Sequence, residues 1–222
     1  MKNDMNLIEY SEKEKILDSE MSIIWENPYL DGITDYEFFQ KASVKILWVL
    51  KEPNGKGGGN QRVFHKEVFY YNRWKSTYGN IMRVSYGILN NANNYSDIPE
   101  IDSKECKIID SIVLNEIAII NINKSGGGSV TPFGKMANEY NRKGVKEYLF
   151  KQIEFINPDI IINSHDVKQF FLDLVGNNEI NKHYGEQYSK NNNRIIIWTS
   201  HPNRAPKKSY CNNILKIVNE YK

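Results

Sequence analysis

The chain has 222 residues, a formal net charge of +2 and 40% hydrophobic residues. This length fits one α/β domain, and this share of apolar residues is enough for a full core, which excludes a disordered chain and a disulfide-stapled miniprotein. No apolar run approaches the roughly 20 residues that span a bilayer, and the N-terminus lacks the apolar stretch of a signal peptide. We therefore expect a cytoplasmic, monomeric protein without a membrane segment.

The charge is unevenly distributed along the chain. Residues 1–41 hold four lysines and ten acidic residues, a balance of −6, so the remainder carries +8. This distribution permits a polyanionic partner such as DNA, although an ordinary solvated surface is the simpler interpretation of charge alone. The basic residues of the remainder gather in two places: Lys124, Lys135, Arg142, Lys143 and Lys146, and then Arg194, Arg204, Lys207 and Lys208.

Apolar periodicity predicts the secondary structure in chain order. Helical spacing predicts a helix over 7–24, which Pro28 and Gly32 end. A continuous β-rich apolar run over 44–50 is typical of a strand buried on both faces, and similar runs predict strands over 117–121, 159–163 and 194–199. The stretches between them predict helices over 62–76, 80–91, 104–114, 145–156 and 166–175, with a last helix over 209–221.

Buried strands that alternate with helices indicate a parallel sheet covered on both faces. We expect an α/β fold, a three-layer αβα sandwich with a four-stranded parallel sheet in the order 2-1-3-4. No repeat or long linker divides the chain. Residues 1–222 are therefore predicted to form one domain, with residues 1–41 as an acidic N-terminal helical extension.

Each predicted strand ends in polar or glycine-rich residues, namely KEPNG, NINKSGGG, NSHD and SHPNR. In open parallel sheets, ligands bind outside the carboxyl ends of the strands. We expect the site to contain Glu52, Asn121 or Asn123, and His201, with His165 as a further candidate.

Several common kinds of site are excluded. GSVTPFGKM has one residue too many for a Walker loop, and GKGGGN lacks the third glycine of a dinucleotide fingerprint. Each glycine-rich loop stays open as a phosphate-binding loop or a flexible turn. The four histidines have no two members at metal-ligand spacing, Cys106 and Cys211 lie far apart, and no G-x-S-x-G elbow is present. We expect no metal and no cofactor.

Three segments together resemble the uracil-DNA glycosylase superfamily, over roughly residues 44–220. LKEPN is similar to the first motif of that family, which takes forms such as GQDPY, while IAIININKS is similar to V-Y-I-T-N-V-V-K-C and TSHPNRA to the H-P-S motif. The resemblance implies hydrolysis of the N-glycosidic bond of uracil or another damaged or modified base in DNA. It places Glu52 on the water-positioning residue, Pro53 on the family proline, Asn121 on the base-reading asparagine, Lys124 and Ser125 on the following lysine and cysteine, and His201 on the base-contacting histidine.

The chain departs from the family pattern in several places. Leu50 stands where the family has its first glycine, and Asn203 stands where it has the serine of H-P-S. The cluster-binding cysteines of two subfamilies are missing. Phe64 is the nearest candidate for the aromatic residue under the base. Three more aromatic residues follow it at near-helical spacing, which is more typical of a core: Tyr70, Tyr71 and Trp74.

These residue types fit the cleavage of an N-glycosidic bond, which passes through a sugar cation and a base anion. The Glu52 carboxylate can favour the cation and orient a water. A His201 N–H can stabilise the carbonyl oxygen of the departing base, and the Asn121 amide can read a flipped uracil. Simpler alternatives stay open: Glu52 in a surface ion pair with Lys51 or Lys56, His201 as a cap of the last helix, and Asn121 as a turn residue.

The sequence leaves three functions open. The first is a DNA glycosylase-like hydrolase. The second is a non-catalytic nucleic-acid or nucleotide-binding protein that retains the fold, which the departures at Leu50 and Asn203 favour. The third is a hydrolase of a free nucleoside or another small glycoside. For the first, the catalytic residues are Glu52 and His201, the substrate-binding residues are Pro53, Asn121, Phe64 and Asn203, and the DNA-binding residues are Lys124, Arg204 and Lys207.

Overall fold

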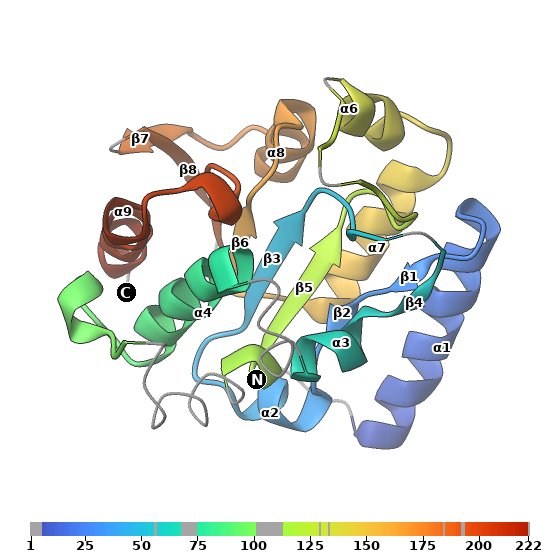
Figure 1. Cartoon of the computed structure of the whole chain (residues 1–222), viewed down its shortest axis with the longest axis horizontal. Helices are drawn as coiled ribbons and strands as arrows, with labels where there is room; N and C mark the ends of the chain where they lie inside the picture. Colours follow the sequence, from blue (N-terminus) through green and yellow to red (C-terminus); the bar gives the residue numbers. More distant parts are fainter. Residues whose placement is uncertain are drawn as a thin grey trace.

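A seven-stranded mixed sheet lies at the centre of the protein (Figure 1). The computed structural model describes residues 6–55, 57–67, 75–100, 113–128, 130–132, 134–183, 185–191 and 194–221. The strand order is β2-β5-β3-β6-β9-β8-β7. The strands are β2 (Gly32–Ile33), β3 (Ile46–Leu50), β5 (Ile117–Asn121), β6 (Ile160–Asn163), β7 (Asn181–His183), β8 (Glu186–Asn191) and β9 (Arg194–Trp198), while β1 (Tyr29–Leu30) and β4 (Gly59–Asn60) form a separate parallel pair.

The prediction of a four-stranded, all-parallel sheet is wrong. The strands β5, β3, β6 and β9 are parallel neighbours, but β2 pairs antiparallel with β5 at one edge. At the other edge, β8 and β7 continue the sheet as antiparallel strands. The sequence did not indicate these strands because β2 has only two residues and β8, EQYSKN, is mostly polar. A polar strand lacks the apolar run by which the buried strands were predicted.

Helices cover both faces of the sheet (Figure 1). Successive side chains of a strand point to opposite faces, so Ile46 and Trp48 of β3 join one core, whereas Leu47 and Val49 join the other. The first core is closed by α4 (Lys75–Leu89) and α9 (Lys207–Asn219), and the second by α1 (Leu7–Ile24), α7 (Val145–Ile156) and α8 (Lys168–Val175). Shorter helices are α2 (Tyr36–Lys41), α3 (Gln61–Glu67), α6 (Lys135–Tyr140) and the 3₁₀ turns η2 (Tyr95–Asp97) and η3 (Pro202–Arg204).

The predicted helices over 7–24 and 145–156 are confirmed as α1 and α7 with the same bounds. The helix predicted over 62–76 ends in α3 at Glu67, and 68–74 lie outside the described residues, as does most of the helix predicted over 104–114, including Cys106. In the part of the chain that the structure describes, no helix is long and apolar enough to cross a membrane.

The acidic N-terminal segment is built into the core instead of extending from it. Tyr10, Leu17, Met21 and Trp25 are buried in the core that α1 shares with α7. The Trp25 indole N–H donates to the Glu139 carboxylate at 2.6 Å, which ties the end of α1 to α6. With β2 as an edge strand, residues 6–41 contribute both a helix layer and a strand.

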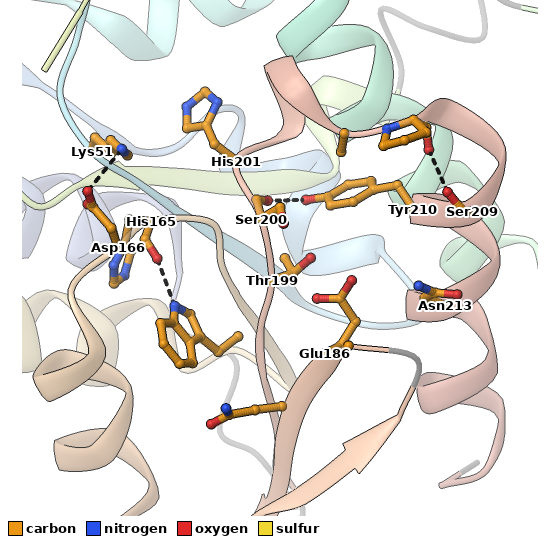
Figure 2. Close-up of a pocket in the computed structure, with 15 residues that line it drawn as sticks. Lys51, His165, Asp166, Glu186, Thr199, Ser200, His201, Ser209, Tyr210 and Asn213 are labelled. Carbon is orange, nitrogen blue, oxygen red and sulfur yellow. Dashed lines mark hydrogen bonds and ion pairs between the residues drawn. The ribbon is translucent and has the colours of Figure 1, made fainter.

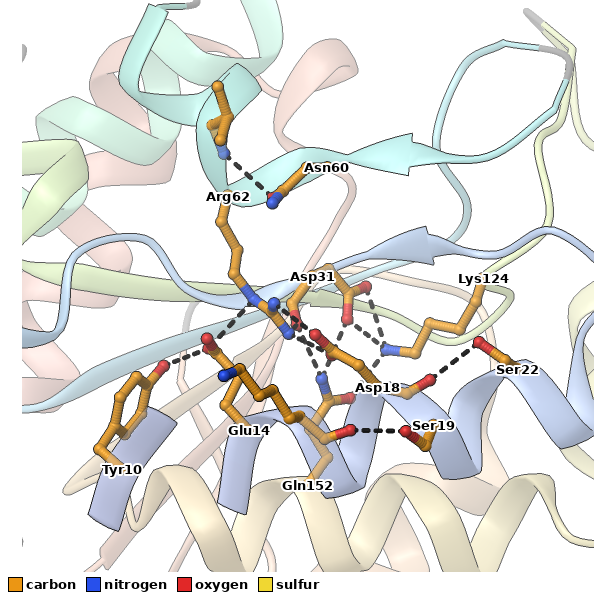
Figure 3. Close-up of polar contacts among 12 residues, drawn as sticks. Tyr10, Glu14, Asp18, Ser19, Ser22, Asp31, Asn60, Arg62, Lys124 and Gln152 are labelled. Atoms are coloured by element: carbon orange, nitrogen blue, oxygen red, sulfur yellow. Dashed lines mark hydrogen bonds and ion pairs between the residues drawn. The ribbon is translucent and has the colours of Figure 1, made fainter. Parts of the chain in front are cut away.

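A buried ion pair joins this segment to the central sheet (Figure 3). The Lys124 ammonium lies 2.7 Å from Asp31 Oδ1, and both side chains have 0% exposure. The Asp31 carboxylate also accepts from the Asn121 backbone N–H at 2.7 Å and from Gln152 Nε2 at 3.0 Å. Burial lowers the pKa of Lys124, and the adjacent Asp31 opposes that shift by favouring the charged ammonium.

Arg62 of α3 extends the network toward α1. Its guanidinium binds Asp18 at 2.7 Å and donates to the Asp31 carbonyl oxygen at 2.9 Å. A second carboxylate of α1, Glu14, lies 3.3 Å from the Arg62 Nε atom. Side chains from α1, α3, α7 and the end of β5 therefore meet around Asp31. A buried charge is tolerated only where opposite charges and hydrogen bonds compensate it, and these side chains supply that compensation.

Lys124→Met tests this network. The substitution leaves the Asp31 carboxylate buried without its cation, so the free energy of unfolding should fall by about 3–5 kcal/mol in urea denaturation. Lys143→Met, at an exposed lysine, is the matched control and should change stability by less than about 0.5 kcal/mol. A Lys124→Met protein as stable as this control would show that the pair does not hold the fold together.

Candidate functional site: a cavity at the carboxyl ends of β6 and β9

A cavity of about 630 Å³ opens at the carboxyl ends of two central strands (Figure 2). It lies where β6 and β9 end, next to the beginning of β8 and the first turns of α9. Parallel neighbours end at the same edge of a sheet, so the residues that follow β6 and β9 meet there. The polar side chains that line it are Lys51, His165, Asp166, Glu186, Gln187, Thr199, Ser200, His201, Ser209, Tyr210 and Asn213.

The turn after β9 is fixed from two helices. Asn80 of α4 donates through Nδ2 to the carbonyl oxygens of Pro202 and Ala205, at 2.7 and 3.2 Å. The Tyr210 hydroxyl of α9 donates to the Ser200 carbonyl oxygen at 3.1 Å. These bonds hold the residues on either side of His201, so the backbone that carries the imidazole is defined by the core.

His201 has a fixed acceptor atom. Its Nδ1 accepts from the Asn203 backbone N–H at 3.3 Å, which caps the 3₁₀ turn η3. In a neutral imidazole one nitrogen accepts and the other carries the proton, so Nε2 is the N–H donor. His201 therefore caps the 3₁₀ turn η3 and not the last helix, which was the simpler alternative from the sequence. Its ring also lines the cavity.

His165, which follows β6, is held in the same tautomer. Its Nδ1 accepts from the Val167 backbone N–H at 3.1 Å, and the ring packs edge-on against Phe170. Its side chain is buried, and Nε2 makes no hydrogen bond with the residues that the structure describes. Burial lowers the pKa of His165 to about 3, so this imidazole is neutral at physiological pH.

Two carboxyl groups of the cavity have different environments. Asp166 is half-exposed, and its Oδ2 lies 3.3 Å from the Lys51 ammonium, so Lys51 pairs with Asp166 and not with the neighbouring Glu52. Glu186, at the beginning of β8, is only 8% exposed. Burial raises the pKa of Glu186, and the nearby Thr199 and Asn213, as donors to the charged form, oppose this rise.

Glu52 does not line this cavity. Its carboxylate lies 2.6 Å from the Lys135 ammonium and accepts from Thr131 Oγ1 at 2.9 Å and from Asn123 Nδ2 at 3.1 Å. The Glu52 side chain is 3% exposed. Glu52 therefore forms a buried ion pair with Lys135, and Lys51 pairs with Asp166 instead. Lys56, the other lysine expected to pair with Glu52, lies outside the described residues.

Close backbone contacts hold Glu52 there. The loop after β3 pairs with the loop after β5, where the Gly127 N–H donates to the Pro53 carbonyl oxygen at 2.8 Å and the Gly55 N–H donates to the Gly127 carbonyl oxygen at 3.1 Å. A Cβ atom on Gly127 would overlap the Glu52 carboxyl group, and one on Gly126 would overlap the Gly55 carbonyl oxygen. The second glycine-rich loop therefore packs closely around Glu52 and is not a freely flexible turn.

Asn121 and Lys124 take part in the Asp31 network. The Asn121 Nδ2 donates to Asp31 Oδ2 at 3.2 Å, so its amide is directed at a protein carboxylate. Lys124 has no exposed side-chain surface for a phosphate contact. These placements do not fit the base-reading role that the resemblance implies for Asn121 or the DNA-binding role predicted for Lys124, because each side chain is buried and already has a protein partner.

The remaining predicted residues are dispersed. Phe64 of α3 packs edge-on against His65 and Tyr78 at the margin of the first core, and Pro53 is buried. Asn203 and Lys207 are exposed in and just after the turn that carries His201. For Arg204 the structure describes the backbone in η3 but not the side chain, and Tyr70, Tyr71 and Trp74 lie outside the described residues.

Sequence reasoning missed Glu186 and the residues of α9 that line the cavity. Glu186 reaches the site through the pairing of Gln187 with Trp198 in an antiparallel hairpin. Each of the two hairpins that β8 forms has a signal in the sequence: Gly185, which has a φ of 90°, lies between β7 and β8, and a run of asparagines precedes β9. Tyr210 and Asn213 stand three residues apart on α9, a spacing that places side chains on one face of a helix.

No protein-family model matches this chain, and no curated protein matches it either. The likeness to the uracil-DNA glycosylase superfamily therefore rests on short sequence motifs. Within the described residues, no three histidine, cysteine, aspartate or glutamate side chains gather in a way that could hold a metal ion.

The buried histidines predict acid sensitivity. Burial lowers the pKa of His65 to about 4 and that of His165 to about 3, against about 6.5 in an unfolded chain. Below pH 6.5 the unfolded chain therefore binds protons that the folded protein does not, and stability falls by up to about 1.4 kcal/mol per pH unit for each histidine. Glu116 and Glu186, whose pKa burial raises, take up protons in the folded protein and act in the opposite sense.

His165→Asn checks this prediction, because the Asn side-chain oxygen can accept from the Val167 N–H without an ionisable ring. Urea denaturation at pH 7.5 and pH 5.0 should show a loss of stability that is smaller in His165→Asn than in the wild type by about 2 kcal/mol. Equal losses in both proteins would contradict the burial of a neutral His165.

Proposed function

We propose that this chain is a DNA glycosylase-like protein, which binds a base displaced from DNA in the cavity and hydrolyses its N-glycosidic bond. The observation that carries the proposal is His201, which follows a parallel strand, lines the cavity and has Nδ1 occupied by the backbone of its own turn. An imidazole that presents Nε2–H can donate to the carbonyl oxygen of a departing base, where negative charge develops.

The cavity has the size and polarity for such a ligand. Small-molecule sites measure about 300–1,000 Å³ and combine apolar walls with a few polar groups, and this cavity has about 630 Å³ with Trp198, Ala205 and Pro206 among its walls. Enzymes that act on a base extrude it from the stack into a pocket of this kind. His165 adds a neutral ring at the same strand edge.

Glu52 is the proposed water-positioning carboxylate, and this role requires that its carboxylate be released from its present partners. It directly follows Lys51, which lines the cavity, so the two sites adjoin. Its carboxylate is held by Lys135, whose side chain is 38% exposed at the beginning of α6. In this proposal Lys135 must move away when DNA binds, so that the Glu52 carboxylate can face the sugar and favour its cation.

Binding without cleavage is the second candidate function. It is favoured by the three polar partners of Glu52 and by the contact of Asn121 with Asp31. A carboxylate that holds two loops together, and an amide that is already paired, need no catalytic explanation. In this alternative the cavity retains a base or nucleotide through His201 and its neighbours.

Base release tests the two candidates. Single-turnover assays would use single- and double-stranded oligonucleotides that carry uracil, hypoxanthine, xanthine or an alkylated adenine. His201→Ala should lower the release rate by about 10²–10³, because one preorganised donor is removed. Glu52→Gln should lower it by at least as much, because the amide keeps the shape but removes the charge that favours the sugar cation.

Glu179→Gln, at an exposed carboxylate that is not among the residues lining the cavity, is the matched control and should retain the wild-type rate. Wild-type rates in both site variants would refute the catalytic assignment. A wild-type protein that binds the oligonucleotides tightly but releases no base would favour binding without cleavage.

DNA binding should depend on the exposed lysines at the beginning of α9. Lys207 and Lys208 follow the turn that carries His201 and stand at the positive end of the helix dipole. Replacing both with glutamine should make the slope of log affinity against log salt concentration less steep. The slope should change by about 0.7 for each phosphate of single-stranded DNA that the protein no longer neutralises. Lys15→Gln with Lys41→Gln, on α1 and α2, is the control pair. DNA binding that is insensitive to salt, or unchanged by the double replacement, would show that this face does not bind DNA, and a protein that binds no DNA at all would favour a hydrolase of free nucleosides.

A further inference from the structure

Glu186 is placed in the cavity by the hairpin at the edge of the sheet. Gly185, with a φ of 90°, precedes it, and its neighbour Gln187 pairs with Trp198 at the end of β9. Figure 2 shows the carboxyl group beside Thr199 and Asn213, within the cavity that His201 also lines. Only 8% of the residue is exposed. The carboxyl group therefore contacts whatever fills the cavity rather than bulk water.

This carboxyl group differs from the other two near the site. Glu52 is paired with Lys135 and Asp166 with Lys51. None of the lysine and arginine side chains that the structure describes forms an ion pair with Glu186. The polar groups that face it are Thr199 and Asn213, together with Tyr210, whose pKa is raised mainly by burial and further by the charge of Glu186. A buried carboxylate without a cation is costly unless N–H or O–H donors satisfy its oxygens.

We propose that Glu186 selects a base that carries an exocyclic amino group, such as a derivative of cytosine, adenine or guanine, over a base that has a carbonyl group at that position. The inference rests on the proposed function, since it names the class of base that the same cavity accepts. An amino group of the base supplies a further N–H donor to Glu186 from the cavity side, beside Thr199 and Asn213. Glutamate accepts in the same way from the N4 amino group of cytosine in DNA recognition.

A base with a carbonyl group instead directs an oxygen at the carboxylate. Two acceptors then face each other in a site with little water, and neither is satisfied. A site built to hydrogen-bond one group discriminates strongly against an analogue that lacks it, because its buried polar atoms are left unpaired. Uracil and hypoxanthine are therefore poorer ligands of this cavity than their amino counterparts, cytosine and adenine.

The experiment uses oligonucleotides in which one base is flanked by abasic sites, so that a single base can enter the cavity. Three pairs differ by an amino group in place of a carbonyl group: cytosine and uracil, adenine and hypoxanthine, guanine and xanthine. Fluorescence anisotropy with the full-length protein should give an affinity at least about tenfold higher for the amino member of one or more pairs, the value of one charge-assisted hydrogen bond.

Glu186→Gln should abolish this preference, because the amide can donate to a carbonyl oxygen as well as accept from an amino group. The affinity for the carbonyl member should stay the same or rise. Glu179→Gln, which makes the same chemical change at an exposed position, should keep the wild-type preference. Should Glu186→Gln fold poorly, Glu186→Asp keeps the charge with a shorter side chain and should weaken the preference without reversing it.

The outcomes separate the two proposals. A wild-type protein that binds all of these oligonucleotides equally, or a preference that survives in Glu186→Gln, would overturn the role of Glu186 and leave the proposed function standing. A wild-type protein that binds none of them, with or without a base, would overturn the proposed function and this inference together.

Discussion

The buried ion pair between Asp31 and Lys124 constrains the rest of the structure. Both side chains are withdrawn from water, so the charges are tolerable only while they compensate each other. Asp31 stands beside β2 and Lys124 follows β5, and Gln152 of α7 bonds both. One interaction thereby fixes an edge strand, a central strand and a helix against one another. It also draws Asn121 and Lys124 away from any ligand at the strand ends.

The second constraint is the close approach of the two glycine-rich loops. Their backbones hydrogen-bond directly, and the space over the Glu52 carboxyl group is closed by Gly127, where a side chain would not fit. This packing directs the Glu52 carboxylate toward the end of β5, whereas the cavity lies on the other side of β3, at the ends of β6 and β9. Any catalytic use of Glu52 consequently requires that Lys135 move away, whereas His201 already lines the cavity.

Residues of one type acquire different properties from their surroundings. The Glu52 carboxylate forms a buried ion pair with a lysine, Asp166 forms an ion pair with a lysine at the surface, and Glu186 is buried among uncharged polar side chains. The surroundings of a carboxyl group thereby set its hydrogen-bonding role, and at Glu186 burial also raises the pKa. The cavity therefore brings two imidazoles and a buried carboxyl group together, and the proposed recognition of a base rests on this combination.

The sequence by itself determined the central strands, because continuous runs such as ILWVL and IAIIN occur where a strand is buried on both faces. It determined α1 and α7 for the same kind of reason, since an apolar face must recur with the period of a helix. It also indicated that His165 and His201 lie at one edge of the sheet, because parallel strands share the direction of their carboxyl ends.

Only the tertiary structure decided where the side chains at that edge point and what pairs with them. Asn121 and Glu52 both lie at strand ends as expected, but Asp31 and Lys135, remote in sequence, engage them. Glu186 enters the cavity from an antiparallel hairpin whose polar sequence carries no strong strand signal. The physical reason is that periodicity reports which residues are buried together, whereas the partners of a buried charge depend on contacts between segments that the chain brings together only when it folds.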